Sequence, residues 1–286
     1  MKKKKCICLG SFDGLHRGHM KVLENGKGSE YETVLVTFDV HPADFFSNKA
    51  HFKLLQKQIV DEKLKEKNII VSRLPSDRVY ELTAEDFFEK VLLKSFSPDK
   101  ISCGYNYTFG KDKKGDVDLL RNLCEKSGII LSVAEPIECD GEVISSTRIR
   151  KKIADGEIDV ANELLGYKFC YRAEVIHGDK RGSTTLQTPT ANQIYPDELI
   201  VPKFGVYKSS VIYDGKEYKA ITNIGLRPTI GTNIFLSETH IIDFSKDIYG
   251  EVIEVNLEKF IRPERQFDSL NDLKNQIKND ISEAKK

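Results

Sequence analysis

The chain has 286 residues, of which 40% are hydrophobic and 31% charged, and its 44 basic side chains balance its 44 acidic ones. This balance excludes the global basic field that draws proteins to nucleic acid, and the length suits one large domain or two of medium size. No apolar run approaches the roughly 18 residues that span a bilayer, and no apolar core for a signal peptide follows the basic N-terminus. We therefore expect neither a nucleic-acid partner nor a membrane association.

The six cysteines are scattered along the chain and show neither a Cys-x-x-Cys pair nor a zinc-ligand spacing. Four of them lie in apolar or strand-like stretches. This distribution is typical of reduced core thiols, and it favours a cytoplasmic protein.

The first half of the chain alternates between apolar runs and helical segments. Residues 6–9 and 33–38 are near-continuous apolar runs, as in strands that are buried on both faces of a parallel sheet, and a helix over 19–27 lies between them. Further strands are expected at 69–74, 100–104 and 129–135, and further helices at 56–68, after Thr83 and at 117–126. This order predicts a doubly wound α/β domain whose ligands bind at the carboxyl ends of the strands.

The turn after the first strand reads GSFDGLHRGH over residues 10–19. Its glycines permit a sharp turn, and the helix that follows presents backbone N–H groups to phosphate. Histidines three positions apart share one face of a helical turn, where both can donate to phosphate oxygens as charge builds in a transition state. For an isolated HxGH motif, a plain glycine turn with two surface histidines is an equally good interpretation. The candidate residues are Gly10, Phe12, Asp13, Gly14, His16 and His19.

Two further strand ends carry polar groups. FDVHP at 38–42 follows the second strand, so Asp39 and His41 are expected to face the same site, although a turn before Pro42 explains the pattern equally well. The glycine-bounded loop GYNYTFG at 104–110 follows the fourth strand and offers Asn106.

ISSTRIR, at 144–150, places hydroxyl groups before a basic helix. Ser145, Ser146 and Thr147 at the helix N-terminus, followed by Arg150, make a second candidate phosphate site. Taken as structure alone, the same pattern is an ordinary N-cap. The distance from the HxGH motif is about the length of a five-stranded α/β domain.

The sequence changes character after a linking helix at 157–168. A small antiparallel barrel is predicted by strand-like segments at 171–177, 205–225, 238–244 and 251–261. Asp214 and Gly215 are the expected turn pair of a hairpin within the second segment. A C-terminal helix is expected over 269–284. Its apolar residues recur at helical spacing and are predicted to face the core: Leu270, Leu273 and Ile277.

The segment HGDKRGSTTLQTPTAN at 177–192 predicts a second site. Gly178 and Gly182 can bring backbone close to phosphates, and Thr190 and Asn192 offer the oxygen ligands that suit Mg²⁺. Glu238 is a candidate general base for an attacking hydroxyl. Taken singly, these residues are also consistent with a turn, a strand cap and an acid at the barrel rim.

These motifs, followed by FGVY, NIGLRPT, ETHIIDF, DIYG and IRPERQF, run in order along nearly the whole chain and resemble the bacterial bifunctional riboflavin kinase/FAD synthetase family. The resemblance implies an α/β then β fold: a Rossmann-like doubly wound nucleotidyltransferase domain, then a small antiparallel β-barrel kinase domain with a C-terminal helix. It implies an FMN adenylyltransferase domain at 1–156, a linking helix at 157–168 and a riboflavin kinase domain at 169–286.

The resemblance also implies two activities, ATP-dependent phosphorylation of riboflavin to FMN and adenylation of FMN to FAD with release of pyrophosphate, both with Mg²⁺. The partners are then small molecules, and the protein is a monomer or a weak oligomer. Carried over by position, the catalytic residues are His16, His19, Arg150 and Glu238. The ATP and phosphate groups are Asn106, Ser145, Ser146, Thr147, Gly178 and Gly182 with the turn at 10–14. The metal ligands are Thr190 and Asn192, and the flavin-binding residues are Asp39, His41, Pro42 and Arg227.

The chain departs from the family pattern at two places. Val40 replaces a proline in TFDPHP, and Ser183 and Gln187-Thr188 alter the loop before PTAN, where family members have arginine and Gly-Phe. One alternative is therefore an FAD synthetase whose C-terminal domain only binds flavin. Another is a nucleotidyltransferase for a different alcohol phosphate with an unrelated barrel.

Overall fold

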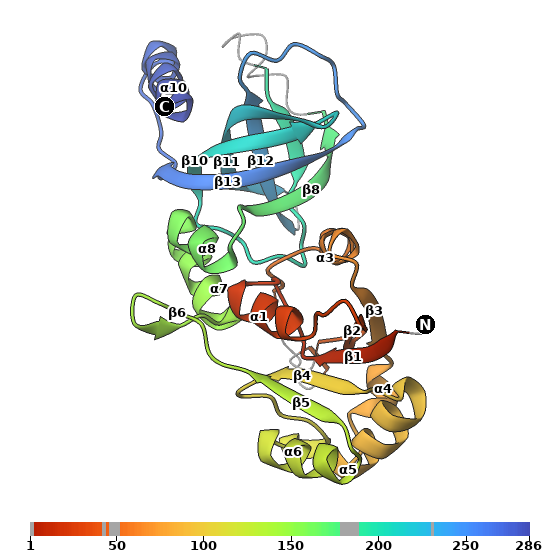
Figure 1. The fold of residues 1–286 in the computed structure, drawn as a ribbon. Coiled ribbons are helices and arrows are strands. Elements are labelled where there is room, and N and C mark those ends of the chain that lie inside the picture. The colour runs from red at the N-terminus through yellow and green to blue at the C-terminus, as the bar shows by residue number, and fades with distance from the viewer. Residues whose placement is uncertain (1–2, 42–43, 46–51, 178–188, 230–231) are drawn as a thin grey trace. The chain divides into compact units, whose positions relative to one another are not determined.

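The computed structural model describes residues 3–41, 44–45, 52–177, 189–229 and 232–286 (Figure 1). The chain forms two compact units, which are treated separately below. The first comprises residues 1–51 and 57–146, and the second comprises residues 52–56 and 147–286. The functional boundaries expected at residues 156 and 168 stay predictions.

The first unit is built on a five-stranded sheet in the order β3-β2-β1-β4-β5, and every neighbouring pair is parallel. This is the doubly wound arrangement that the sequence predicted. Its strands are β1 (Lys4–Leu9), β2 (Tyr31–Phe38), β3 (Ile70–Leu74), β4 (Lys100–Gly104) and β5 (Ile130–Ala134). A separate two-stranded pair joins β6 (Glu138–Cys139) to β7 (Glu142–Val143).

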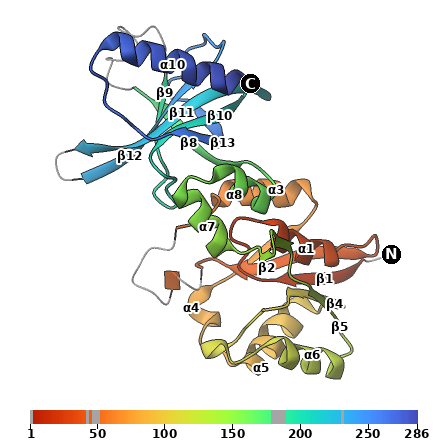
Figure 2. The same cartoon turned by 90° about the vertical axis from the view of Figure 1, so that its left-hand side faces the viewer.

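Alternate side chains of the central strand enter different cores, because strand side chains point to opposite faces. Ile7 and Leu9 pack with the apolar residues of the π-helical segment η1 and of α6, whereas Cys8 packs with those of α1 and α3. Helices therefore cover both faces of the sheet (Figures 1 and 2). The helices of this unit are α1 (Arg17–Asn25), α3 (Lys57–Glu66), α4 (Ser76–Val79), α5 (Ala84–Asp86), η1 (Phe87–Phe96), η2 (Lys111–Lys113) and α6 (Val117–Lys126).

Side-chain caps fix where these helices begin. Thr83 Oγ1 accepts a hydrogen bond from Asp86 N at 3.1 Å, which confirms the start expected after Thr83. Asp116 caps α6 in the same way through Leu119 N. The first helix begins at Arg17 and not at residue 19, because the ring of His16 acts as its N-cap.

The second unit contains a closed barrel in the order β10-β11-β12-β9-β8-β13, which confirms the predicted barrel. The turn between β10 and β11 has positive φ at both Asp214 and Gly215, as a two-residue hairpin turn requires. The elements of the second unit are α7 (Ser146–Asp155), α8 (Ile158–Leu165), β8 (Phe169–Ile176), β9 (Ala191–Ile194), β10 (Gly205–Tyr213), β11 (Lys216–Thr229), β12 (Thr232–Ile241), β13 (Val252–Arg262) and α10 (Leu270–Lys285).

Three barrel strands differ from expectation: β9, β11, which runs to Thr229 and not to residue 225, and β12, which begins at Thr232 and not at residue 238. Strand β9 was not predicted, because its polar residues Asn192 and Gln193 are buried and hide the apolar alternation that marks a strand. Strand β12 ends at Ile241, three residues before the predicted end, and the chain then turns with positive φ at Asp243.

The C-terminal helix corrects one part of the predicted core. Leu270 is 57% exposed, so it is not a core residue as its spacing suggested. The contact with the barrel begins later in α10: Ile277 and Ile281 pack with buried Ala284, Ile221 and Ile242. Leu270, in the first turn of the helix, is not part of this cluster.

Residues 52–56 belong to the second unit, although the sequence places them between elements of the first. The side-chain amide of Gln56 donates to Arg172 O at 3.0 Å and accepts from Arg172 N at 2.7 Å, so it pairs with the backbone of β8. Lys53 N donates to Glu198 O at 2.7 Å, and Lys53 O accepts from Ile200 N at 2.9 Å. These hydrogen bonds are the reason why residues 52–56 belong to the second unit.

All six cysteines are buried free thiols, as predicted. Among the described residues, no helix combines the length and apolar character needed to cross a membrane.

Candidate active sites

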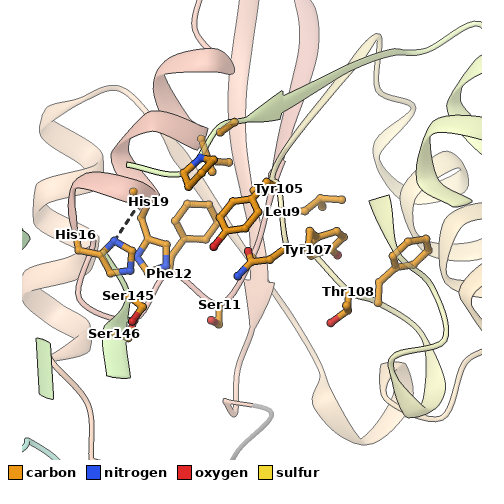
Figure 3. A pocket seen from close by; sticks show the side chains of 18 of the residues that line it. Leu9, Ser11, Phe12, His16, His19, Tyr105, Tyr107, Thr108, Ser145 and Ser146 are labelled. Carbon is orange, nitrogen blue, oxygen red and sulfur yellow. Dashed lines mark hydrogen bonds between the residues drawn. The ribbon is translucent and has the colours of Figure 1, made fainter. Parts of the chain in front are cut away.

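The first unit has a cavity of about 950 Å³ at the carboxyl ends of its strands (Figure 3). Leu9, Phe38, Gly104 and Ala134, which are the last residues of β1, β2, β4 and β5, all line it. This is the edge at which a doubly wound sheet binds its ligands.

The two motif histidines lie together at the start of α1. Their rings stack with centroids 3.6 Å apart and planes at 20°, and both line the cavity. His16 Nδ1 accepts from His19 N at 3.3 Å (Figure 3). Because Nδ1 is an acceptor in this bond, the proton of neutral His16 sits on Nε2, which makes that atom a hydrogen-bond donor.

Two glycines make room for these rings. A Cβ on Gly18 would lie 3.1 Å from His16 Cε1, so a larger residue there would push on the imidazole. Gly10 has φ +157°, and a Cβ there would meet the Phe12 ring at 2.9 Å. Gly18 thus permits close packing beside His16, and Gly10 permits close packing beside Phe12.

His19 is held in its neutral form. Burial lowers its pKa well below the ordinary value, because the imidazolium is poorly solvated there, and the neighbouring His16 and His41 lower the pKa further. The buried Nδ1 of His19 has no hydrogen-bond partner among the described residues. An anion in the cavity would supply both missing features, a negative charge and an acceptor.

The serines of ISSTRIR lie in the same cavity. Ser145 and Ser146 line it, and Figure 3 shows them on the side of the histidines. Ser146 Oγ donates to Asp13 O at 3.0 Å, which joins the two motifs directly. Thus the structure unites motifs that lie more than a hundred residues apart in the sequence.

Other residues of the predicted phosphate set lie elsewhere. Asp13 and Gly14 shape the turn but are not among the residues that line the cavity. Thr147 and Arg150 belong by their contacts to the second unit, where Arg150 Nε donates to Phe52 O at 2.8 Å. Their predicted roles toward ATP stay predictions.

The opposite end of the cavity is aromatic. Tyr105, Asn106 and Tyr107 line it together with Phe109, and the rings of Tyr107 and Phe109 stack at 5.7 Å with planes at 11°. Such faces suit a flat ring system. Sequence reasoning found this loop but missed Tyr80, which lines the cavity from the residue after α4 and had no motif to mark it.

Only part of the 38–42 segment lines the cavity. His41 lines the cavity, but Asp39 does not. The Asp39 carboxylate instead accepts hydrogen bonds from the hydroxyl and backbone N–H of Ser76, and these bonds lower its pKa. Pro42 lies outside the described residues.

The second unit gathers its predicted residues where β9 and β12 pair. Glu238 and Asn192 stand opposite each other in register, so their side chains share one face with Cβ atoms about 5 Å apart. Asn192 Nδ2 donates to Thr190 O at 3.2 Å, which turns the amide oxygen the other way. Thr190, Asn192 and Glu238 therefore lie near one another, Thr190 directly before β9, Asn192 on β9 and Glu238 on the neighbouring strand β12.

A histidine that the sequence reasoning missed supports this group. His240 lies two residues beyond Glu238 on the same face of β12, and its Nδ1 is 2.9 Å from Pro189 O. The carbonyl can only accept, so Nδ1 carries the proton. The only signal in the sequence is its alternation with Glu238.

Several remaining residues lie apart from this group or are not described. Arg227 lies on β11 in register with Ile234. Gly178, Gly182, Ser183, Gln187 and Thr188 fall outside the described residues.

Comparison with known proteins identifies a family for each of the two units. The FAD synthetase family model matches residues 1–148, and the riboflavin kinase model matches residues 165–286. A protein of Pseudomonas fluorescens named bifunctional riboflavin kinase/FMN adenylyltransferase is 32% identical over 98% of this chain and 92% of its own. Proteins of the same name from Haemophilus influenzae and Escherichia coli K12 are each 34% identical, covering 98% and 96% of this chain and 92% and 90% of their own.

A solved structure is similar over the whole length. A Streptococcus pneumoniae protein titled macrolide-efflux protein superposes with a TM-score of 0.89 at 31% identity, covering all of this chain and 95% of its own. Both family models and the near-full-length relatives show the same family: this chain belongs to the bifunctional riboflavin kinase/FMN adenylyltransferase family.

Proposed function

We propose that this protein makes FAD in two steps, phosphorylating riboflavin to FMN in the barrel unit and adenylating FMN in the cavity of the first unit. The observation that carries the second step is the cavity itself, where His16, His19, Ser145 and Ser146 converge at the carboxyl ends of parallel strands. Both family models match the chain, which favours the bifunctional interpretation over a barrel that only binds flavin.

In the adenylyl transfer, a phosphate oxygen of FMN attacks the α-phosphorus of ATP and pyrophosphate leaves. The chain supplies positioning and charge stabilisation, with little covalent chemistry. His16 donates through Nε2, and the Nδ1 of His19, which has no partner among the described residues, is available to a phosphate oxygen. The N–H groups at the start of α1 and the hydroxyls of Ser145 and Ser146 add donors.

In the kinase step, the terminal hydroxyl of the riboflavin side chain attacks the γ-phosphorus of ATP, and ADP leaves. Glu238 is the proposed base that takes the hydroxyl proton. Thr190 and Asn192 are the proposed Mg²⁺ ligands, and their neutral oxygen atoms fit a hard cation that keeps waters and shares substrate phosphates. When bound, Mg²⁺ would neutralise charge on the transferred phosphate.

Location and assembly are part of the proposal. Six buried free thiols are what a reducing compartment allows, which supports the cytoplasm. A monomer or weak oligomer is expected, because both sites are built from one chain.

The test is a product assay. Purified protein receives ATP, Mg²⁺ and either riboflavin or FMN, and the flavins are separated by chromatography. The native chain is expected to convert riboflavin to FMN and then to FAD. His19→Ala should abolish FAD formation and leave FMN formation intact, whereas Glu238→Gln should do the reverse.

Each variant serves as the control for the other, because both reactions are measured on one sample. Loss of both activities in a folded His19→Ala protein would contradict two separate sites. Unchanged riboflavin phosphorylation in Glu238→Gln would remove Glu238 as the base.

A further inference from the structure

The carboxylate of Asp39 is bonded to the neighbouring short helix. Its Oδ1 accepts from Ser76 Oγ at 2.5 Å, from Ser76 N at 2.9 Å and from Val40 N at 2.7 Å. Pro75, at the N-cap position of α4, makes no side-chain cap bond. Asp39 thus caps α4 from the end of β2.

Two hydroxyls complete this arrangement on the Val40 carbonyl. Ser76 Oγ lies 3.0 Å from Val40 O, and the hydroxyl of Tyr80 donates to the same oxygen at 2.6 Å. Ser76 is 2% exposed, whereas Asp39 and Val40 are exposed, so a buried serine holds a strand end that faces solvent. We call the set Asp39, Val40, Ser76 and Tyr80 the strand-end anchor.

The anchor controls one wall of the cavity. Phe38, His41 and Tyr80 line the cavity, and they lie within or directly beside the anchor. The Phe38 and Tyr80 rings pack with centroids 4.8 Å apart, so these residues would move together. Asp39 and Ser76 are not among the lining residues and act only through the residues that they hold.

We propose that Asp39 is a positioning residue for FMN adenylylation, acting with Ser76 to fix the strand end that places Phe38, His41 and Tyr80 in the cavity. This rests on the proposed function of that cavity. It replaces the earlier expectation that Asp39 binds flavin directly. It also gives Val40 a role in this chain, since a proline there could not donate to Asp39.

A double-mutant cycle tests whether Asp39 positions the strand end together with Ser76 or binds flavin directly. Asp39→Ala and Ser76→Ala should each lower kcat/KM for FMN about fivefold or more, and the double variant should be no worse than the poorer single one. Such non-additivity is expected when two residues act through one arrangement. Asp39→Asn keeps an acceptor oxygen and should recover most of the activity. Asp77→Ala, an exposed carboxylate one residue beyond Ser76, is the matched control and should change nothing.

The readouts exclude a general loss of structure. Riboflavin phosphorylation, measured on the same samples, should stay at the native rate. If Asp39→Ala fails to fold, Ser76→Ala alone carries the test, because it removes the anchor's hydroxyl and leaves the Asp39 carboxylate in place. If Ser76→Ala leaves FMN kinetics unchanged while the Asp39 variant raises KM for FMN, Asp39 is a direct ligand and the proposal is wrong.

Failure of the cavity assignment would look different. If His19→Ala still makes FAD, the cavity is not the adenylylation site, and the positioning role falls with it.

Discussion

The contact between α10 and the barrel combines the apolar cluster around Ala284 with one buried ion pair. Asp280, which is 2% exposed, accepts from Arg262 Nη2 at 2.8 Å and from Arg262 Nε at 3.1 Å, and Gln276 Nε2 adds a bond at 2.7 Å. Asp280→Ala removes the carboxylate and leaves the Arg262 guanidinium, 17% exposed, without its counter-charge. Breaking a buried pair in this way costs about 3–5 kcal/mol. For a unit of this size, that lowers the melting temperature by about 6–20 °C.

The assay is heat inactivation with both reactions followed on one sample. Riboflavin phosphorylation in Asp280→Ala should be lost at a lower temperature than in the native chain, while FAD formation from FMN keeps its native profile. Glu283→Ala is the control on the same helix, because Glu283 pairs with Lys286 in solvent and such pairs contribute about 0–1 kcal/mol.

A second variant tests the electrostatic reasoning itself. Replacing both partners, Arg262→Met with Asp280→Leu, removes the unpaired charge and should recover much of the lost stability. If Asp280→Ala melts no lower than Glu283→Ala, the pair does not hold the helix and the reasoning is wrong.

Two further predictions concern histidines. His240→Ala should lower kcat/KM for riboflavin phosphorylation about two- to tenfold, the worth of one neutral hydrogen bond, with FAD formation unchanged and partial rescue by His240→Asn, whose amide can still donate to Pro189 O. Equal rates in His240→Ala and the native chain would remove this role. His19 has a lowered pKa in the folded state, so its stabilising effect is complete above the unfolded pKa of about 6.5 and is lost as the pH falls toward the folded value. Between pH 7.5 and 5.5 the first unit should therefore lose about 1 kcal/mol of unfolding free energy through this residue. The His19→Gln protein should lose less unfolding free energy over the same pH range. Identical pH dependence in denaturant titrations of the two proteins would contradict the lowered pKa of His19.

The sequence by itself determined the architecture of both units and the motifs at their candidate sites. Continuous apolar runs separated by capped helices predict parallel strands buried on both faces, and five such strands are too few to close a (β/α)8 barrel. The turn at 10–19 and the serines at 145–146 were identified because phosphate binding needs glycines, helix N-termini and hydroxyls at fixed spacing. These features are local, and local features can be seen in a sequence.

Only the tertiary structure decided which residues act together. Asp39 looked like a ligand, but its carboxylate accepts from Ser76, a partner 37 positions away that no local pattern connects to it. Leu270 had core spacing yet is exposed, and residues 52–56 pair with the barrel unit. Strand β9 was hidden because it buries polar side chains, and the Nε2 of Gln193 donates to the Ala173 carbonyl on a strand 20 positions away. In each case the deciding contact joins residues far apart in the chain, and the energy of such a contact depends on a geometry that exists only after folding.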